Sequence, residues 1–133
     1  MIMIHKFSVS TRDRIQFVNI DSDVRRIVND TGVKDGYCIV FVPHTTAAVT
    51  INENADPDVV RDMIMETSKI VPLSDGYHHA EGNSAAHIKA SFFGASELVI
   101  ISGGDLVFGT WQSLFFCEFD GPRTRKVYVR VVG

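Results

Sequence analysis

The sequence predicts a single α+β domain over residues 1–133, built mainly on antiparallel sheet with about three helices. A chain of 133 residues suits one hydrophobic core. Strand-like segments lie at both ends, and the order of strands and helices along the chain is that of an α+β domain. With 45% hydrophobic and 22% charged residues, the composition is typical of a globular protein. No repeat, low-complexity tract or linker divides the chain.

The N-terminal part predicts a β-hairpin followed by a helix. Segments 4–9 and 15–20 are strand-like, and the polar residues 11–14 between them suit a hairpin turn. Polar and acidic residues at 21–23 then mark the start of a helix, and an apolar stripe continues to Gly32. We expect this helix to be structural.

Residues 37–42 predict a central strand. The run is continuous and apolar, so both of its alternating faces need cover. The strand delivers His44 to its end, and a second extended segment follows at 45–51. Asp56 is the expected N-cap of a helix over 58–69, which has proline as a favourable first residue.

Residues 72–82 predict a loop, because they contain proline, serine and glycine and lack periodicity. A short helix over 84–93 follows, with Asn83 or Ser84 available as N-cap and Gly94 as the terminating glycine.

The spacing on this short helix separates a polar face from an apolar one. Asn83, His87 and Ser91 are four residues apart and share a face, whereas Ile88 and Phe92 form a pair expected in the core. His87 falls in the first turn, where exposed N–H groups and the helix dipole disfavour a second proton. We therefore expect His87 to be neutral.

The C-terminal third predicts strands. Segment 98–101 is a clear strand, and 106–119 is strand-like with an interruption at Gly109 that is typical of a bulge. After a turn, 123–132 alternates apolar and polar residues, so we expect a half-buried last strand.

Charge and cysteine content exclude several classes of function. A net charge of −3 argues against a surface for nucleic acid or anionic membrane, and no apolar run approaches the ~20 residues of a membrane span. We expect a cytoplasmic protein with a small-molecule substrate. Cys38 and Cys117 lie in apolar segments and form no close pair, which favours buried thiols over a disulfide.

Three histidines are the first candidates for a site. His44 follows a strand, His79 lies in the loop and His87 opens a helix. Three imidazoles with an open fourth position suit a zinc-type ion. The alternative is that the loop histidines, His78 included, are solvated and that His87 is a structural residue at the helix start.

Carboxylates and basic residues complete the candidate set. Glu53, Asp56 and Glu81 are candidates for general base, for partner of a histidine or for magnesium ligand, although Asp56 also reads as a plain helix cap. A phosphate clamp could use Arg123 or Lys89, unless these are solvated surface groups. The groups that would assist the clamp are Asn83, Thr45 and Thr46. Trp111 suits stacking on a planar ring or a place in the core.

Three long motifs resemble the YjbQ family, also called UPF0047. They are PHTTAAVTINENADPDVVRD, HAEGNSAAHIKASFFG and GDLVFGTWQSLFFCEFDGPR, and the resemblance covers nearly the whole chain. It implies a small α+β domain that assembles as a homotrimer, and the label secondary thiamine-phosphate synthase. Carried over by position, the motif residues are His44, His79, His87, Glu53, Asp56, Asp62, Gly109, Thr110, Trp111, Gln112 and Arg123.

The resemblance and the residues together give three hypotheses. The first is an enzyme that acts on a phosphorylated or heteroaromatic small molecule, with condensation of a pyrimidine diphosphate and a thiazole phosphate as the named case. The second is a metal-dependent hydrolase or lyase, and the third a non-catalytic ligand-binding trimer. We expect a divalent metal, either zinc-type at the histidines or magnesium for a diphosphate, and no organic cofactor. The expected catalytic set is His44, His79, His87, Glu53 and Asp56, and the expected substrate-binding set is Thr45, Thr46, Asn83, Lys89, Thr110, Trp111, Gln112 and Arg123.

Overall fold

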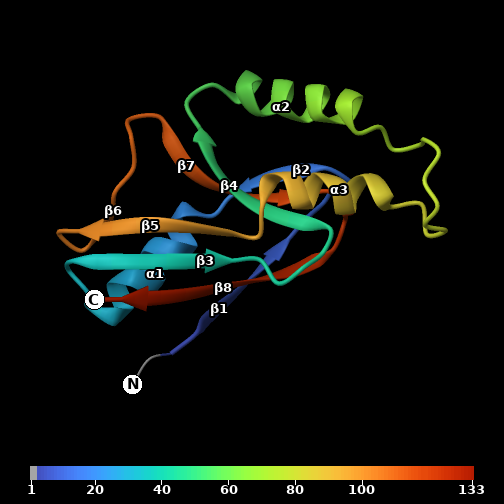
Figure 1. The fold of residues 1–133 in the computed structure, drawn as a ribbon. Helices are drawn as coiled ribbons and strands as arrows, with labels where there is room; N and C mark the ends of the chain where they lie inside the picture. Colours follow the sequence, from blue (N-terminus) through green and yellow to red (C-terminus); the bar gives the residue numbers. More distant parts are fainter. Residues whose placement is uncertain (1–2) are drawn as a thin grey trace.

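The computed structural model describes residues 3–133 as two antiparallel sheets and three helices (Figure 1), which confirms the predicted α+β class. The five-stranded sheet has the order β1-β8-β3-β5-β6, and the three-stranded sheet has the order β2-β7-β4. The strands are β1 (His5–Ser10), β2 (Gln16–Asn19), β3 (Gly36–Phe41), β4 (Ala47–Glu53), β5 (Ser96–Ser102), β6 (Asp105–Leu106), β7 (Gln112–Glu118) and β8 (Thr124–Val132). The helices are α1 (Asp21–Thr31), α2 (Pro57–Ile70) and α3 (Ser84–Phe93).

The main core lies between the two sheets and includes one side of α1. Its members come from both sheets and the helix, and include Val24, Val40, Val49, Phe116 and Val127, each fully buried. A second cluster lies on the other face of the three-stranded sheet, where α3 packs, and contains Ala48, Ala86, Ala90, Phe115, Cys117 and Phe119. The short alanines of α3 let the helix approach the sheet closely, and this fixes the position of the candidate site at the start of α3.

The predicted N-terminal hairpin is wrong. β1 pairs with β8 in the five-stranded sheet, whereas β2 pairs with β7 in the three-stranded sheet. The polar link between them crosses from one sheet to the other and is held by Thr11, whose backbone N–H donates to the Arg123 carbonyl at 2.8 Å. Polar residues between two strand-like segments therefore connect sheets here and do not close a turn.

β3 is central, as predicted, with β8 on one side and β5 on the other. The expectation that both of its faces are covered is wrong for the single chain. Cys38 and Val40 are buried, but Tyr37, Ile39 and Phe41 alternate with them and are 38%, 37% and 42% exposed. An apolar face of the sheet is thus open to solvent in the isolated chain.

The two predicted helix ends at glycine are present. Gly32 ends α1 in the left-handed conformation, with φ of 73°, and Gly94 follows α3 with φ of 99°. α2 begins at Asp56, whose carboxylate accepts a hydrogen bond from the Asp58 N–H at 2.9 Å. This confirms the N-cap. No residue of α2 is fully buried, although Val60 packs against the second cluster; Figure 1 shows the helix as the outermost of the three.

The predicted core face of α3 is wrong. Phe92 is 72% exposed, whereas Lys89 is only 4% exposed, and Ile88 is half-buried. The face that packs on the sheet is the one that carries Ala86 and Ala90, because small side chains are needed there. Both cysteines are buried free thiols, as predicted. No helix within residues 3–133 is long and apolar enough to cross a membrane.

Candidate functional site

The His79–His87 pair is the closest association of candidate residues. His87 lies in the first turn of α3, and the preceding loop folds His79 against it. The ring centroids are 5.6 Å apart and the rings are nearly perpendicular, at 88°. The pair borders a surface depression of about 470 Å³, which is lined by Gly76, Tyr77, His78, His79, Ser84, His87 and Ile88.

The loop that carries His79 is closed by a hydrogen bond near its start. The hydroxyl of Tyr77 donates to the Pro72 carbonyl at 2.6 Å, which closes the segment into a compact turn. Glu81, further along the loop, places Oε2 3.8 Å from His79 Nε2. Both side chains remain accessible, with 47% of His79 and 74% of Glu81 exposed. A carboxylate is thus available beside the imidazole pair.

His44 lies on the link from β3 to β4 and borders a second depression of about 480 Å³. Its Nε2 accepts a hydrogen bond from the Lys126 N–H at 2.9 Å, which requires that nitrogen to be unprotonated. Burial lowers the pKa of His44, and the charge of Arg125 lowers it further. The second depression is lined by His44, Thr45, Ala47, His87, Ala90, Ser91, Gly94 and Ala95.

The expected three-histidine metal site is not formed. His87 borders both depressions, so the three imidazoles follow one another along the surface and do not surround one point. Within residues 3–133 no group of three or more histidine, cysteine or acidic side chains is arranged to hold a metal ion. The physical reason is that His44 is held beside β8 by its bond to Lys126 and borders a different depression from His79.

A buried ionic network supports the His44 end of the site. Arg125 and Glu118 form a salt bridge at 6% and 0% side-chain exposure, and Arg125 also donates to the Thr46 hydroxyl at 2.9 Å. The Thr11 hydroxyl donates to Glu118 at 2.8 Å. Thr46, expected to bind substrate, is thereby committed to the network and is buried, whereas Thr45 is exposed.

Sequence reasoning missed this network, although a signal was present. Arg125 is in phase with Val127 and Val129 along an alternating strand, and Glu118 is in phase with Phe116. A charged residue at a core-facing position of a strand requires a buried partner of opposite charge. When one chain has two such core-facing charges of opposite sign, each is the expected buried partner of the other.

Asn83 and Arg123 meet at Asp120. The Asn83 amide donates to the Asp120 carboxylate at 3.0 Å, and Arg123 donates to the same oxygen at 3.1 Å. This links the start of α3 to the turn between β7 and β8. Arg123 is therefore partly neutralised by Asp120 and is not a free phosphate clamp in this arrangement.

A second set of candidates lies at the other end of the three-stranded sheet. Glu53 ends β4 and pairs in register with Gln112, which begins β7. With about 3.3 Å of rise per residue, the six steps from Ala47 to Glu53 span roughly 20 Å, so these residues are far from His44. Thr110 and Trp111 lie at this same end and are exposed, with Trp111 at 62%. Asp56 caps α2 and is likewise not brought to the histidines.

Lys89 is also apart from the histidines. It lies on α3 but points toward α2, where its ammonium group donates to the Ser68 hydroxyl at 3.3 Å. The sequence-derived set is thus divided among four places in the single chain: the histidine surface, the Asp120 turn with Asn83 and Arg123, the Glu53–Trp111 end of the sheet, and the space between α2 and α3.

The fold and its histidine surface define a class of small single-domain α+β proteins in which a histidine-bearing helix packs on an antiparallel sheet. The sequence profile described as "UPF0047 protein YjbQ-like" matches residues 5–133. The chain belongs to the YjbQ/UPF0047 family, as the resemblance predicted.

Relatives and solved structures agree with this assignment. The chain is 46% identical to a UPF0047 protein of Methanocaldococcus jannaschii, covering 98% of this chain and 95% of the relative. It is 44% identical to UPF0047 protein YugU of Bacillus subtilis, covering 98% and 100%. A crystal structure of an uncharacterized YjbQ/UPF0047 protein from Clostridium acetobutylicum superposes with a TM-score of 0.95 at 51% identity, covering 96% and 99%.

The expected function is corrected by these findings. The relatives are named only as UPF0047 proteins, and a Sulfolobus solfataricus neighbour, with a TM-score of 0.94 at 34% identity and coverage of 100% and 98%, is described as a YbjQ-like protein of unknown function. None of these names refers to thiamine-phosphate synthesis. Together with the unformed three-histidine site in residues 3–133, they overturn both the synthase reading and the reading as a three-histidine hydrolase or lyase. The names of these relatives give no ligand for the third reading, a non-catalytic ligand-binding trimer.

Proposed function

We propose that the protein binds a divalent ion of the zinc class between His79 and His87. The observation that carries the proposal is the separation of their ring centroids, 5.6 Å. Two imidazoles that ligate one tetrahedral ion at about 2.0–2.1 Å have centroids roughly 5 Å apart, so a small side-chain adjustment brings both nitrogens to a common ion. Imidazole is also a preferred donor for this class of metals.

Glu81 supports the proposal as a third donor after a side-chain movement, since the three groups do not surround one point in the described arrangement. Its carboxylate oxygen is 3.8 Å from His79 Nε2, and its side chain is 74% exposed, so little packing opposes a movement toward the ion. Two histidines and one carboxylate leave at least one coordination position for water or a ligand. This donor set differs from the three-histidine set, because His44 has no part in it.

Metal titration tests the proposal. Purified protein, stripped with chelator, is titrated with Zn²⁺ and with Co²⁺, whose absorption reports tetrahedral coordination. We expect one ion per chain, loss of at least tenfold in affinity in His87→Ala and in His79→Ala, and a smaller loss in Glu81→Gln. His44→Ala is the matched control and should bind as the wild type does.

Two outcomes contradict this donor set. If His44→Ala loses metal as fully as His87→Ala, the three histidines act together and the pair is not the site. If the stripped wild-type protein takes up no ion while its thermal unfolding stays cooperative, the pair is structural. Unfolding curves of each variant separate loss of binding from loss of fold.

We also propose that the chain assembles as a homotrimer through an apolar face of the five-stranded sheet. The residues of this outer sheet face are Tyr37, Ile39, Phe41, Leu98 and Ile100, which are 37% to 57% exposed in the single chain. They are contiguous, since Tyr37 pairs with Ile100 and Ile39 with Leu98 across β3 and β5. An exposed apolar patch of this kind is typical of an interface between subunits. The number of subunits follows from the family resemblance.

A further inference from the structure

Lys89 is a buried cation without a counter-charge. Its side chain is 4% exposed, and its one hydrogen bond is to the Ser68 hydroxyl of α2, at 3.3 Å. The ammonium group lies 5.9 Å from the centroid of the Phe119 ring. No carboxylate in residues 3–133 forms a salt bridge with it. Two of its three donor positions are therefore left for another partner.

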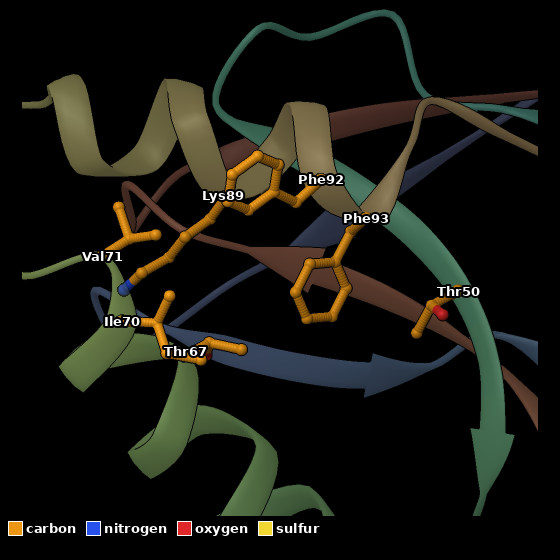
Figure 2. Close-up of a pocket in the computed structure, with 7 residues that line it drawn as sticks. All are labelled: Thr50, Thr67, Ile70, Val71, Lys89, Phe92 and Phe93. Atoms are coloured by element: carbon orange, nitrogen blue, oxygen red, sulfur yellow. The ribbon is translucent and has the colours of Figure 1, made fainter.

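The ammonium group borders a cavity between α2, α3 and β4 of about 290 Å³ (Figure 2). Figure 2 shows its nitrogen beside Ile70 and Val71, with the Phe93 ring between it and Thr50 on β4. The walls are mainly apolar, and the lining residues are Thr50, Thr67, Ile70, Val71, Lys89, Phe92 and Phe93. The Thr67 hydroxyl already donates to a backbone carbonyl of its own helix, at 2.6 Å from Met63 O.

A smaller cavity of about 120 Å³ is also lined by Lys89. It is also lined by Asn83, whose Oδ1 is buried and has no hydrogen-bond partner within the described chain. A buried ammonium with free donors and a buried amide oxygen with no donor are both costly to leave unsatisfied. Both line the smaller cavity, together with the charged residues Arg14 and Asp120. An amide oxygen accepts hydrogen bonds and is no partner for a carboxylate, so of the two groups only Lys89 offers an anion site, and it does so in the larger cavity.

We propose that the cavity between α2 and α3 binds a small carboxylic acid with an apolar body. The carboxylate pairs with the Lys89 ammonium, and the apolar part lies against Ile70, Phe92 and Phe93. This also explains the exposure of Phe92, which is 72% in the chain alone and falls when a ligand covers it. The proposal is independent of the metal site, because Lys89 and the histidine pair lie on different sides of α3.

One carboxylate matches the charge of the site. Lys89 is the only cation that lines the larger cavity within the described residues, so one negative charge is balanced and a second is not. A phosphate group, with close to two charges at neutral pH, would need a further Arg or Lys. Burial also lowers the pKa of Lys89, and a bound carboxylate acts in the opposite direction by favouring the charged amine.

Binding of hexanoate and benzoate is the test, monitored by NMR of protein with ¹³C-labelled lysine in the presence of chelator. We expect saturable binding that shifts the Lys89 side-chain signal, and at least tenfold weaker binding of hexanamide, which has the same shape without the charge. Lys89→Met should lose hexanoate binding at least tenfold. Lys69 is an exposed lysine near the end of α2, the helix that faces Lys89 across the cavity. Lys69→Met is the matched control and should bind as the wild type does.

The wild-type spectrum alone can overturn the proposal, so the test does not depend on whether the Lys89 variant folds. If neither acid moves the Lys89 signal, or if hexanamide binds as tightly as hexanoate, the cavity is no carboxylate site. If hexanoate binds Lys89→Met with wild-type affinity, the cavity is likewise no carboxylate site. His87→Ala should bind hexanoate normally, which keeps this result separate from that of the metal titration.

Discussion

At the scale of single residues, the Glu118–Arg125 pair is the buried ion pair that supports the His44 end of the site. Both side chains are buried and their hydrogen bonds also fix Thr11 and Thr46. Burial alone would raise the pKa of Glu118, but hydrogen bonds from Arg125 and Thr11 outweigh it and hold that pKa below its usual range. Glu118 is thus ionised in the folded protein, and its stabilising effect is lost only as pH falls through that lowered pKa.

We predict that Glu118→Leu lowers the free energy of unfolding by about 3–5 kcal/mol, because it leaves the Arg125 charge buried and unpaired. The double variant Glu118→Leu, Arg125→Met removes both charges and should regain most of this loss. Urea unfolding measures both. Equal destabilisation in the single and double variants would mean that the pair itself, and not the unpaired charge, carries the stability.

His44 gives a pH dependence with a definite sign. Burial and the Arg125 charge lower its pKa in the folded state, whereas the unfolded chain has the ordinary value of about 6.5. As pH falls through about 6.5, the unfolded chain binds a proton that the folded chain does not yet bind. The free energy of unfolding should therefore decrease with falling pH until the lowered pKa has been passed.

The measurement for His44 compares urea midpoints at pH 7, 6 and 5 in the wild type and in His44→Gln. The glutamine oxygen reaches the position of Nε2 and can accept the Lys126 N–H there, so the packing is largely kept while the titrating group is removed. We expect a smaller decrease between pH 7 and pH 5 in the variant. Parallel slopes in the two proteins would show that His44 does not contribute to the acid sensitivity.

At the scale of elements, α2 is the helix with the weakest support from packing. None of its residues is fully buried, and its start depends on the Asp56 cap. We predict that Asp56→Ala costs about 0.5–2 kcal/mol and that the loss is local: amide exchange of residues 58–60 accelerates, whereas that of 38–41 in β3 does not. Asp56→Asn keeps a capping oxygen and should exchange nearly as the wild type does.

The elements that sequence reasoning placed correctly are those fixed by local chemistry. The Asp56 cap, the glycines after α1 and α3, and the alternation of Val127 and Val129 depend on residues close in the chain. The N-terminal hairpin was wrong because β1 and β2 find partners more than ninety residues away, on β8 and β7, and no local pattern encodes that choice.

The site was predictable to a similar degree. The polar face of α3 and the preceding loop lie within ten residues of each other, so His79 and His87 could be recognised as neighbours. The core face of α3 could not be predicted. Residue type favours burying Phe92 and exposing Lys89, and the structure does the reverse. The small alanines beside Lys89 determine the orientation, since only they fit against Phe115 and Phe119.

At the scale of the whole molecule, the sharpest prediction concerns the assembly of the chain into a trimer. Multi-angle light scattering at micromolar concentration should give three times the chain mass of 14.8 kDa. Leu98→Glu places a charge at the centre of the outer sheet face and should give a monomer. Because Leu98 is 57% exposed in the single chain, its substitution should leave the fold intact by circular dichroism.

Met65→Glu is the matched control for this experiment. Met65 is a large apolar residue on α2 with 49% exposure, outside the outer sheet face. Its variant should remain trimeric. A wild-type mass near 14.8 kDa, or a trimer that survives Leu98→Glu, would show that another surface, or none, holds the subunits together.

The position of β8 has a consequence for how the chain is made. This strand follows all others in the sequence, yet it lies between β1 and β3 in the sheet. Until residues 124–132 have been synthesised, two earlier strands expose unpaired edges, and such edges readily join with those of other chains. A chain that ends before Thr124 therefore lacks the strand between β1 and β3 and should be prone to aggregation. During synthesis, the edges of β1 and β3 stay open to intermolecular pairing until β8 has left the ribosome.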